Sequence, residues 1–132
     1  MCGALVAVVD DDAAVCESIS SLLRSAGYRC ATFNSGEGFL ASGPPGEIDC
    51  IVLDIRMPGM SGLDLHLALT GMNHPAPVIY VTATPDDGMR ERARSQGAAA
   101  FLPKTFEDED LLNVIRHVVN DLAPDKERLW RA

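Results

Sequence analysis

The sequence has no apolar run approaching the roughly 18 to 20 residues that a membrane-spanning helix needs. Its first ten residues lack a basic leader and run into an acidic cluster, unlike a secretory signal. Basic residues are also few, with 11 Lys and Arg against 19 Asp and Glu. Because nucleic-acid affinity depends on neutralising phosphates, this balance disfavours a DNA or RNA partner. We therefore expect a cytoplasmic protein that contacts neither nucleic acid nor membrane.

Closely spaced pairs of metal-binding residues are missing as well. No CxxC pair occurs among the four cysteines, which are Cys2, Cys16, Cys30 and Cys50. The three histidines are equally scattered: His66, His74 and His117. This pattern predicts free, mostly buried thiols and no zinc site.

What the sequence does contain is a five-fold alternation of short apolar runs with helical patterns. The runs cover residues 5–9, 28–33, 50–53, 78–81 and 98–102. Strands that are apolar on both faces are typical of a parallel sheet covered by helices on each side. With 132 residues, 47% of them hydrophobic, the chain can bury one such core. We predict one α/β domain over residues 1–123, and a C-terminal tail or the start of a linker over residues 124–132.

Two helices are marked clearly by their apolar positions or by their ends. After the turn at residues 57–62, the inner side of one helix is expected to carry Leu63, Leu65, Leu67 and Leu69. A later helix is expected from about Asp86 to Gln96, where Gly97 stops it.

Polar side chains stand where four of the five apolar runs end. They are Asp10, Asp11, Asp54, Thr82 and Lys104. In open parallel sheets, ligands bind outside the carboxyl ends of the strands. Crowded carboxylates repel one another, and a divalent cation with one ammonium group would balance three of them. This set suits in-line attack of a carboxylate on phosphorus.

Each of these residues also has an ordinary structural explanation. Asp10 and Asp11 could belong to a helix N-terminus, as Asp12 is expected to do, and Asp54 could be a turn residue. Thr82 could be a plain β-branched strand end, and Lys104 a solvated surface lysine. Only their joint occurrence at the strand ends favours the chemical interpretation.

Four segments resemble the receiver domain of response regulators, a CheY-like fold. They are Val8–Asp12, Val52–Gly62, Val81–Ala83 and Phe101–Lys104. The resemblance covers residues 5–122 and is closest to receivers of the FixJ type. It implies a doubly wound, five-stranded parallel sheet of order 2-1-3-4-5 with five helices.

The resemblance also implies roles for individual residues. Asp54 would be the phosphoacceptor, and Mg²⁺ or Mn²⁺ would be bound by Asp11, Asp54 and the Arg56 carbonyl, with Asp10 in indirect support. Thr82 and Lys104 would contact the phosphoryl oxygens. Two further implied roles are a switch formed by Thr82 and Phe101, and tuning of the phosphate lifetime by Arg56 and Thr84.

One position departs from the family pattern. The family usually has proline after the lysine, often with a cis bond, whereas here Thr105 follows Lys104. A cis bond before a non-proline residue costs about 2.5 to 4 kcal/mol, so we expect a trans bond. The reach of Lys104 then becomes a question for the structure.

The function implied is a phosphoacceptor switch in two-component signalling, not a turnover enzyme. The expected partners are a sensor histidine kinase or phosphotransfer protein, and a downstream target or second copy bound through the fourth helix, fifth strand and fifth helix. A stand-alone regulator, a phosphate relay and a piece of a longer regulator all fit. Two rivals are a haloacid-dehalogenase-like phosphatase, suggested by Asp10, Asp12 and Thr82, and an unphosphorylated interaction module, suggested by Thr105.

Overall fold

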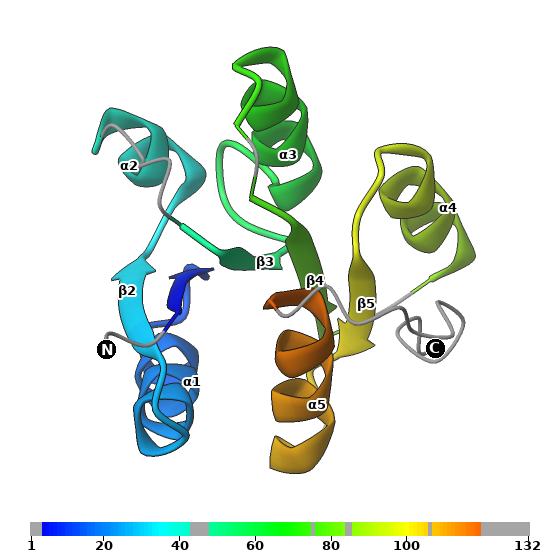
Figure 1. Cartoon of the computed structure of the whole chain (residues 1–132). Coiled ribbons are helices and arrows are strands. Elements are labelled where there is room, and N and C mark those ends of the chain that lie inside the picture. The colour runs from blue at the N-terminus through cyan, green and yellow to red at the C-terminus, as the bar shows by residue number, and fades with distance from the viewer. Residues whose placement is uncertain (1–3, 43–47, 75, 84–85, 106, 120–132) are drawn as a thin grey trace.

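The computed structural model describes residues 4–42, 48–74, 76–83, 86–105 and 107–119. Within them, strands and helices alternate along the chain (Figure 1). The strands are β1 Leu5–Val9, β2 Arg29–Phe33, β3 Cys50–Asp54, β4 Val78–Thr82 and β5 Ala100–Pro103. The helices are α1 Ala13–Ser25, α2 Gly36–Ala41, α3 Gly62–Gly71, α4 Asp87–Ser95 and α5 Asp108–Val119.

All four strand pairs are parallel, and the strand order is β2-β1-β3-β4-β5. This is the doubly wound α/β fold of order 2-1-3-4-5 that the resemblance to receiver domains implies. Figure 1 shows α2, α3 and α4 on one face of the sheet and α1 and α5 on the other. In the described part of the chain, no helix combines the length and the apolar character needed to cross a bilayer.

The apolar core lies in two layers because alternate strand residues point to opposite faces of the sheet. Under α1 and α5 lie Val6, Val8, Val52, Ile79 and Leu102, among others. Under α2, α3 and α4 lie Val9, Ile51, Leu53, Tyr80 and Phe101, among others. The central strands β3 and β4 are buried at every position, which explains their unbroken apolar sequences.

Local sequence sets the ends of the helices. Asp12 caps α1 by accepting hydrogen bonds from Ala14 N and Val15 N, and Gly27, with φ of 93°, follows its last turn. The expected helix from Asp86 to Gln96 is confirmed as α4, with these two residues as its caps.

One predicted core position is wrong. Leu67 of α3 is 52% exposed, whereas Leu63, Leu65 and Leu69 are buried as expected. His66 takes the inward place instead, because its ring nitrogen meets the buried Tyr80 hydroxyl. A polar residue with a buried partner therefore lies on the face that the leucine pattern had assigned to Leu67.

The cysteines agree with the prediction where they are described. Cys16 and Cys50 are buried and Cys30 is half-buried, and all three are free thiols. Burial raises the pKa of each of these thiols, which keeps them protonated and unreactive near neutral pH. Cys2 and the tail at 124–132 lie outside the described residues.

Candidate functional site

The predicted polar residues meet at one edge of the sheet. Asp10 follows β1 directly, Asp54 is the last residue of β3, and Thr82 is the last residue of β4. The strands are in matching register, with Asp54 opposite Val81 and Thr82 opposite Pro103. Lys104 follows β5, so its side chain starts at the same edge.

Three carboxylates come together at this edge. One oxygen from each of Asp10, Asp11 and Asp54 lies within 4.8 Å of the others. Asp10 and Asp54 are buried and Asp11 is exposed, so solvent reaches the group at Asp11. Carboxylate oxygens in this number suit a hard divalent cation such as Mg²⁺. The donor set therefore fits the ion that the sequence implies.

The electrostatics of Asp54 show the cost of this crowding. Burial, followed by the negative charge of Asp10, raises the pKa of Asp54 from 3.8 to about 6. The positive charge of Lys104 opposes this shift without cancelling it. Asp54 is thus an ionisable group in a place that resists its charge, a condition that a bound cation relieves.

Lys104 supplies the positive charge of the site. Its Nζ lies 2.9 Å from Asp10 Oδ2 and 3.5 Å from Asp54 Oδ1. Burial by itself would lower the pKa of Lys104, but the hydrogen bond with Asp10 and the charge of Asp54 raise it overall. The ammonium group is therefore charged at neutral pH.

The departure at Thr105 does not displace this lysine. No cis peptide bond occurs among the described residues, so the Lys104–Thr105 bond is trans, as expected. Lys104 N donates a 2.7 Å hydrogen bond to Thr82 O, which extends the β4–β5 pairing by one residue. The start of the lysine side chain is thereby fixed without the family's proline.

Thr82 carries a hydroxyl that no described residue satisfies. The residue is fully buried, and its Oγ1 has no hydrogen-bond partner among the described residues. Buried hydroxyl groups without a partner are uncommon in proteins. This one stands at the end of β4, beside the strand that carries Asp54, where an oxygen-rich ligand would satisfy it.

Phe101 occupies the predicted switch position in β5. The ring is fully buried in the layer beneath α2, α3 and α4. The guanidinium carbon of Arg90 lies 5.7 Å from the centre of the ring. Arg90 is half-buried against Phe101, whereas Arg94, four residues later on α4, is exposed.

Arg56 and Thr84 were predicted to tune the lifetime of a phosphoryl group. The Arg56 side chain is 60% exposed, and its Nη2 lies 3.6 Å from Asp86 Oδ2 at the start of α4. An exposed pair of this kind contributes about 0 to 1 kcal/mol, so Arg56 can change partners readily. Thr84 lies outside the described residues.

Sequence reasoning missed two sets of polar contacts near the site. Glu37 of α2 accepts a hydrogen bond from Met60 N in the loop after β3. The Tyr80 hydroxyl lies 2.7 Å from His66 Nδ1 and 3.3 Å from Gln96 Nε2. For Glu37 the available signal was its place between two glycines, which indicates close packing. His66 and Tyr80 gave no signal, because neither stands in a recognisable motif.

Comparison with known proteins identifies the family. The family model described as "Response regulator receiver domain" matches residues 6–116. The chain belongs to the response regulator receiver family. The haloacid-dehalogenase-like alternative is thereby set aside, and the family is one of signalling domains in two-component systems.

Curated relatives agree with this assignment. The chain is 40% identical to the response regulator protein TmoT of Ectopseudomonas mendocina over 122 residues, which is 92% of this chain and 55% of TmoT. It is 35% identical to the transcriptional regulatory protein FixJ of Bradyrhizobium diazoefficiens, over 89% of this chain and 57% of FixJ. The chain therefore spans little more than half the length of these relatives.

Solved structures show the same fold. The response regulator StyR superposes with a TM-score of 0.82 at 43% identity, covering 92% of this chain and 61% of StyR. The FixJ-N structure superposes with a TM-score of 0.81 at 32% identity, covering 92% of this chain and 98% of that one. The resemblance to FixJ-type receivers is thus confirmed in both sequence and structure.

Proposed function

We propose that this receiver accepts a phosphoryl group on Asp54 from the phosphohistidine of a sensor kinase or phosphotransfer protein. The observation that carries the proposal is the position of the Lys104 ammonium, 2.9 Å from Asp10 and 3.5 Å from Asp54, beside three converging carboxylates. The domain acts as a phosphoacceptor that changes its partner preference, not as a turnover enzyme.

The transfer would form a bond between an Asp54 carboxylate oxygen and phosphorus and break the bond between phosphorus and the donor histidine nitrogen. Asp54 must be ionised to attack, and with a pKa of about 6 most molecules meet this condition near pH 7. Mg²⁺ or Mn²⁺, held by Asp11, Asp54 and the Arg56 carbonyl with support from Asp10, would supply charge neutralisation at the phosphoryl oxygens.

Two side chains would then hold the transferred group. The Lys104 ammonium can pair with a phosphoryl oxygen, since it already lies between two of the carboxylates. The buried Thr82 hydroxyl, which has no partner among the described residues, can donate to another. Fixed donors aimed at developing negative charge provide the largest contribution to many enzyme-like reactions.

The signal would leave the site through β4 and β5. A shift of Thr82 toward the phosphoryl group would change the packing of Phe101, and with it the face formed by α4, β5 and α5. Coupling energies of this kind are typically about 1 to 3 kcal/mol, enough to change partner preference without an all-or-none transition. A downstream protein or a second copy of the receiver would read the change.

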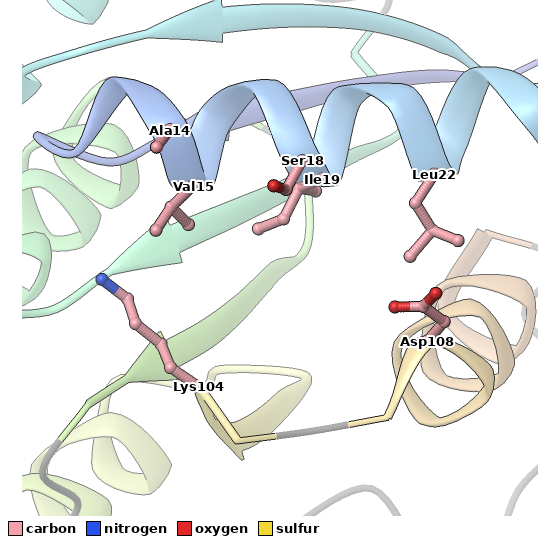
Figure 2. A pocket seen from close by; sticks show the side chains of 7 residues that line it. All are labelled: Ala14, Val15, Ser18, Ile19, Leu22, Lys104 and Asp108. Carbon is pink, nitrogen blue, oxygen red and sulfur yellow. The ribbon is translucent and has the colours of Figure 1, made fainter.

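The phosphodonor has an apolar surface beside the site on which to dock. A groove of about 300 Å³ runs between α1 and α5 (Figure 2). Val15, Ile19 and Leu22 of α1 form one wall, and Lys104 lies at one end of the groove, pointing toward the start of α1. An amphipathic helix carrying the donor histidine would bury its apolar face here and present the phosphoryl group beside the ammonium.

Phosphorylation can be tested without knowing the kinase. The protein is incubated with a small acyl phosphate and Mg²⁺, and its intact mass is measured. We expect a gain of one phosphoryl group in the wild type and in Asp87→Asn, an exposed control, and none in Asp54→Asn. An unchanged wild-type mass, or equal labelling of Asp54→Asn, contradicts the proposal.

A further inference from the structure

The loop between β3 and α3 lies against the first turn of α2, at a contact that none of the roles above explains. We propose that Glu37 of α2 is a positioning residue that fixes this loop, and with it the Arg56 carbonyl, for binding of the divalent cation. The inference rests on the proposed function, because it assigns the Arg56 carbonyl to the metal.

The central contact is a hydrogen bond between segments distant in sequence. Met60 N donates to Glu37 Oε2 over 3.2 Å, and the two residues are 23 positions apart. The acceptor is a side-chain oxygen at the end of a long side chain, and a carboxylate or an amide oxygen at that reach can accept the bond. Because this bond between a side chain and the backbone is exposed to solvent, its effect should be moderate and local.

Two glycines allow the segments to approach so closely. Gly59 has φ of 75°, and a Cβ placed there would lie 2.5 Å from Glu37 Oε2. On the other side, a Cβ on Gly36 would lie 3.0 Å from Met60 Sδ. The carboxylate and the Met60 side chain therefore occupy the spaces that these glycines leave free.

The base of the same loop is held independently. Gly62 N donates a 2.8 Å hydrogen bond to Ile55 O, and a Cβ on Gly62 would lie 2.1 Å from Asp54 O. Arg56 is the residue next to this closure, between the fixed base and the tip at Met60. Met57 is buried as well, so loss of the Glu37 contact should loosen the loop without unfolding it.

A purely structural role for Glu37 makes a different prediction. An acidic residue in the first turn of a helix stabilises that helix through its dipole, whatever it touches outside. In that case the charge of the Glu37 side chain would affect the measurements, and the length of the side chain would not. The two explanations can therefore be separated by variants that keep one property and lose the other.

The experiment measures the Mg²⁺ dissociation constant by titration calorimetry, with urea unfolding in the absence of Mg²⁺ as a second readout. Glu37→Gln keeps an acceptor oxygen at the same reach without charge, whereas Glu37→Asp keeps the charge and shortens the reach. Glu37→Ala loses both the charge and the reach. As a control, Glu17→Ala removes one charge at an exposed position of α1, away from the loop.

We expect Glu37→Ala and Glu37→Asp to weaken Mg²⁺ binding about three- to tenfold, the effect of one lost hydrogen bond. Glu37→Gln should stay within about twofold of Glu17→Ala, by the same reasoning. Full Mg²⁺ affinity in Glu37→Asp with weakened affinity in Glu37→Gln, or equal affinities throughout, overturns the inference.

Failure of the proposed function gives a different result. If the wild type binds Mg²⁺ and the Glu37 series behaves as expected, but a small acyl phosphate leaves the mass unchanged, then phosphorylation is refuted and the positioning role stands. If the wild type is phosphorylated and Mg²⁺ affinity does not respond to reach at position 37, the positioning role alone is refuted.

Discussion

The Asp54 side chain is buried beside another carboxylate, yet its proposed role requires it to be ionised. It is 2% exposed, and its carboxylate lies beside that of Asp10, with the Lys104 ammonium 3.5 Å away. Burial and a like charge both disfavour ionisation, yet the proposed nucleophilic attack requires the ionised form. In the absence of a cation, the folded protein therefore bears the cost of holding this charge.

That cost predicts a stabilising substitution. Asp54→Asn should raise the free energy of unfolding at pH 7 without divalent metal by about 1 to 3 kcal/mol, since a pKa raised from 3.8 to about 6 is worth about 1.4 kcal/mol for each unit. Urea unfolding of the two proteins in a chelating buffer measures the difference. Asp87→Asn serves as the exposed control and should stay within about 0.5 kcal/mol of the wild type. A less stable Asp54→Asn would show that the Lys104 pairing outweighs the repulsion.

At the scale of elements, one buried polar network connects α3, β4 and the end of α4. Gln96 Nε2 donates to the Tyr80 hydroxyl and to Leu63 O, each over 3.3 Å. Because the hydroxyl oxygen accepts from Gln96, its proton is free to be donated to His66 Nδ1, 2.7 Å away. This arrangement needs a neutral histidine, which agrees with the lowered pKa that burial gives to His66.

Removing the hydroxyl should cost stability. Tyr80→Phe keeps the ring in the core but leaves His66 Nδ1 buried without its partner, so we expect a loss of about 1 to 3 kcal/mol in the free energy of unfolding. Chemical denaturation provides the measurement, and Tyr28→Phe, at a half-buried ring before β2, provides the matched control. Equal stability of the two variants would mean that the network contributes little.

The same network predicts a pH dependence. Burial lowers the pKa of His66 below its ordinary value of 6.5, so the unfolded chain binds a proton more readily than the folded one. The contribution of His66 is therefore fully present above about pH 6.5 and declines as the pH falls through the folded pKa. The raised pKa of Asp54 acts in the opposite direction, so the wild type must be compared with a variant.

His66→Gln, which carries no titrating ring, isolates this effect. Between pH 7.5 and pH 5, the free energy of unfolding of the wild type should fall relative to that of His66→Gln. His117→Gln on α5 should follow the wild type. Parallel pH profiles for the wild type and His66→Gln would exclude His66 as the source of acid sensitivity.

For the whole molecule, the architecture and the residues at the strand ends follow from the sequence alone. Unbroken apolar strands such as 50–53 require helices on both faces, and four of the five predicted strands end at one of the candidate polar residues along a common edge. What the pattern could not supply is contact between side chains distant in sequence. Leu67 was placed inward by spacing, whereas the partner of His66 decides which side of α3 faces the sheet.

Contacts made by the loops were equally difficult to predict from the sequence. The sequence raised a doubt about Lys104 because Thr105 replaces the usual proline, and only the hydrogen bond from Lys104 N to Thr82 O resolves it. Likewise, the contact between Glu37 and Met60 depends on two glycines in separate segments approaching each other. Such contacts depend on three-dimensional distance, which local propensity does not encode.

The candidate site residues all stand at or just after the ends of strands, and α1 and α4 are the helices that come after β1 and β4 (Figure 1). The outward sides of these two helices can therefore diverge without altering the proposed phosphoryl transfer at this edge of the sheet. Related proteins with this fold can acquire a new phosphodonor or a new downstream partner by surface substitutions alone. The residues of the proposed reaction and the residues that select partners can thus evolve separately within this chain of 132 residues.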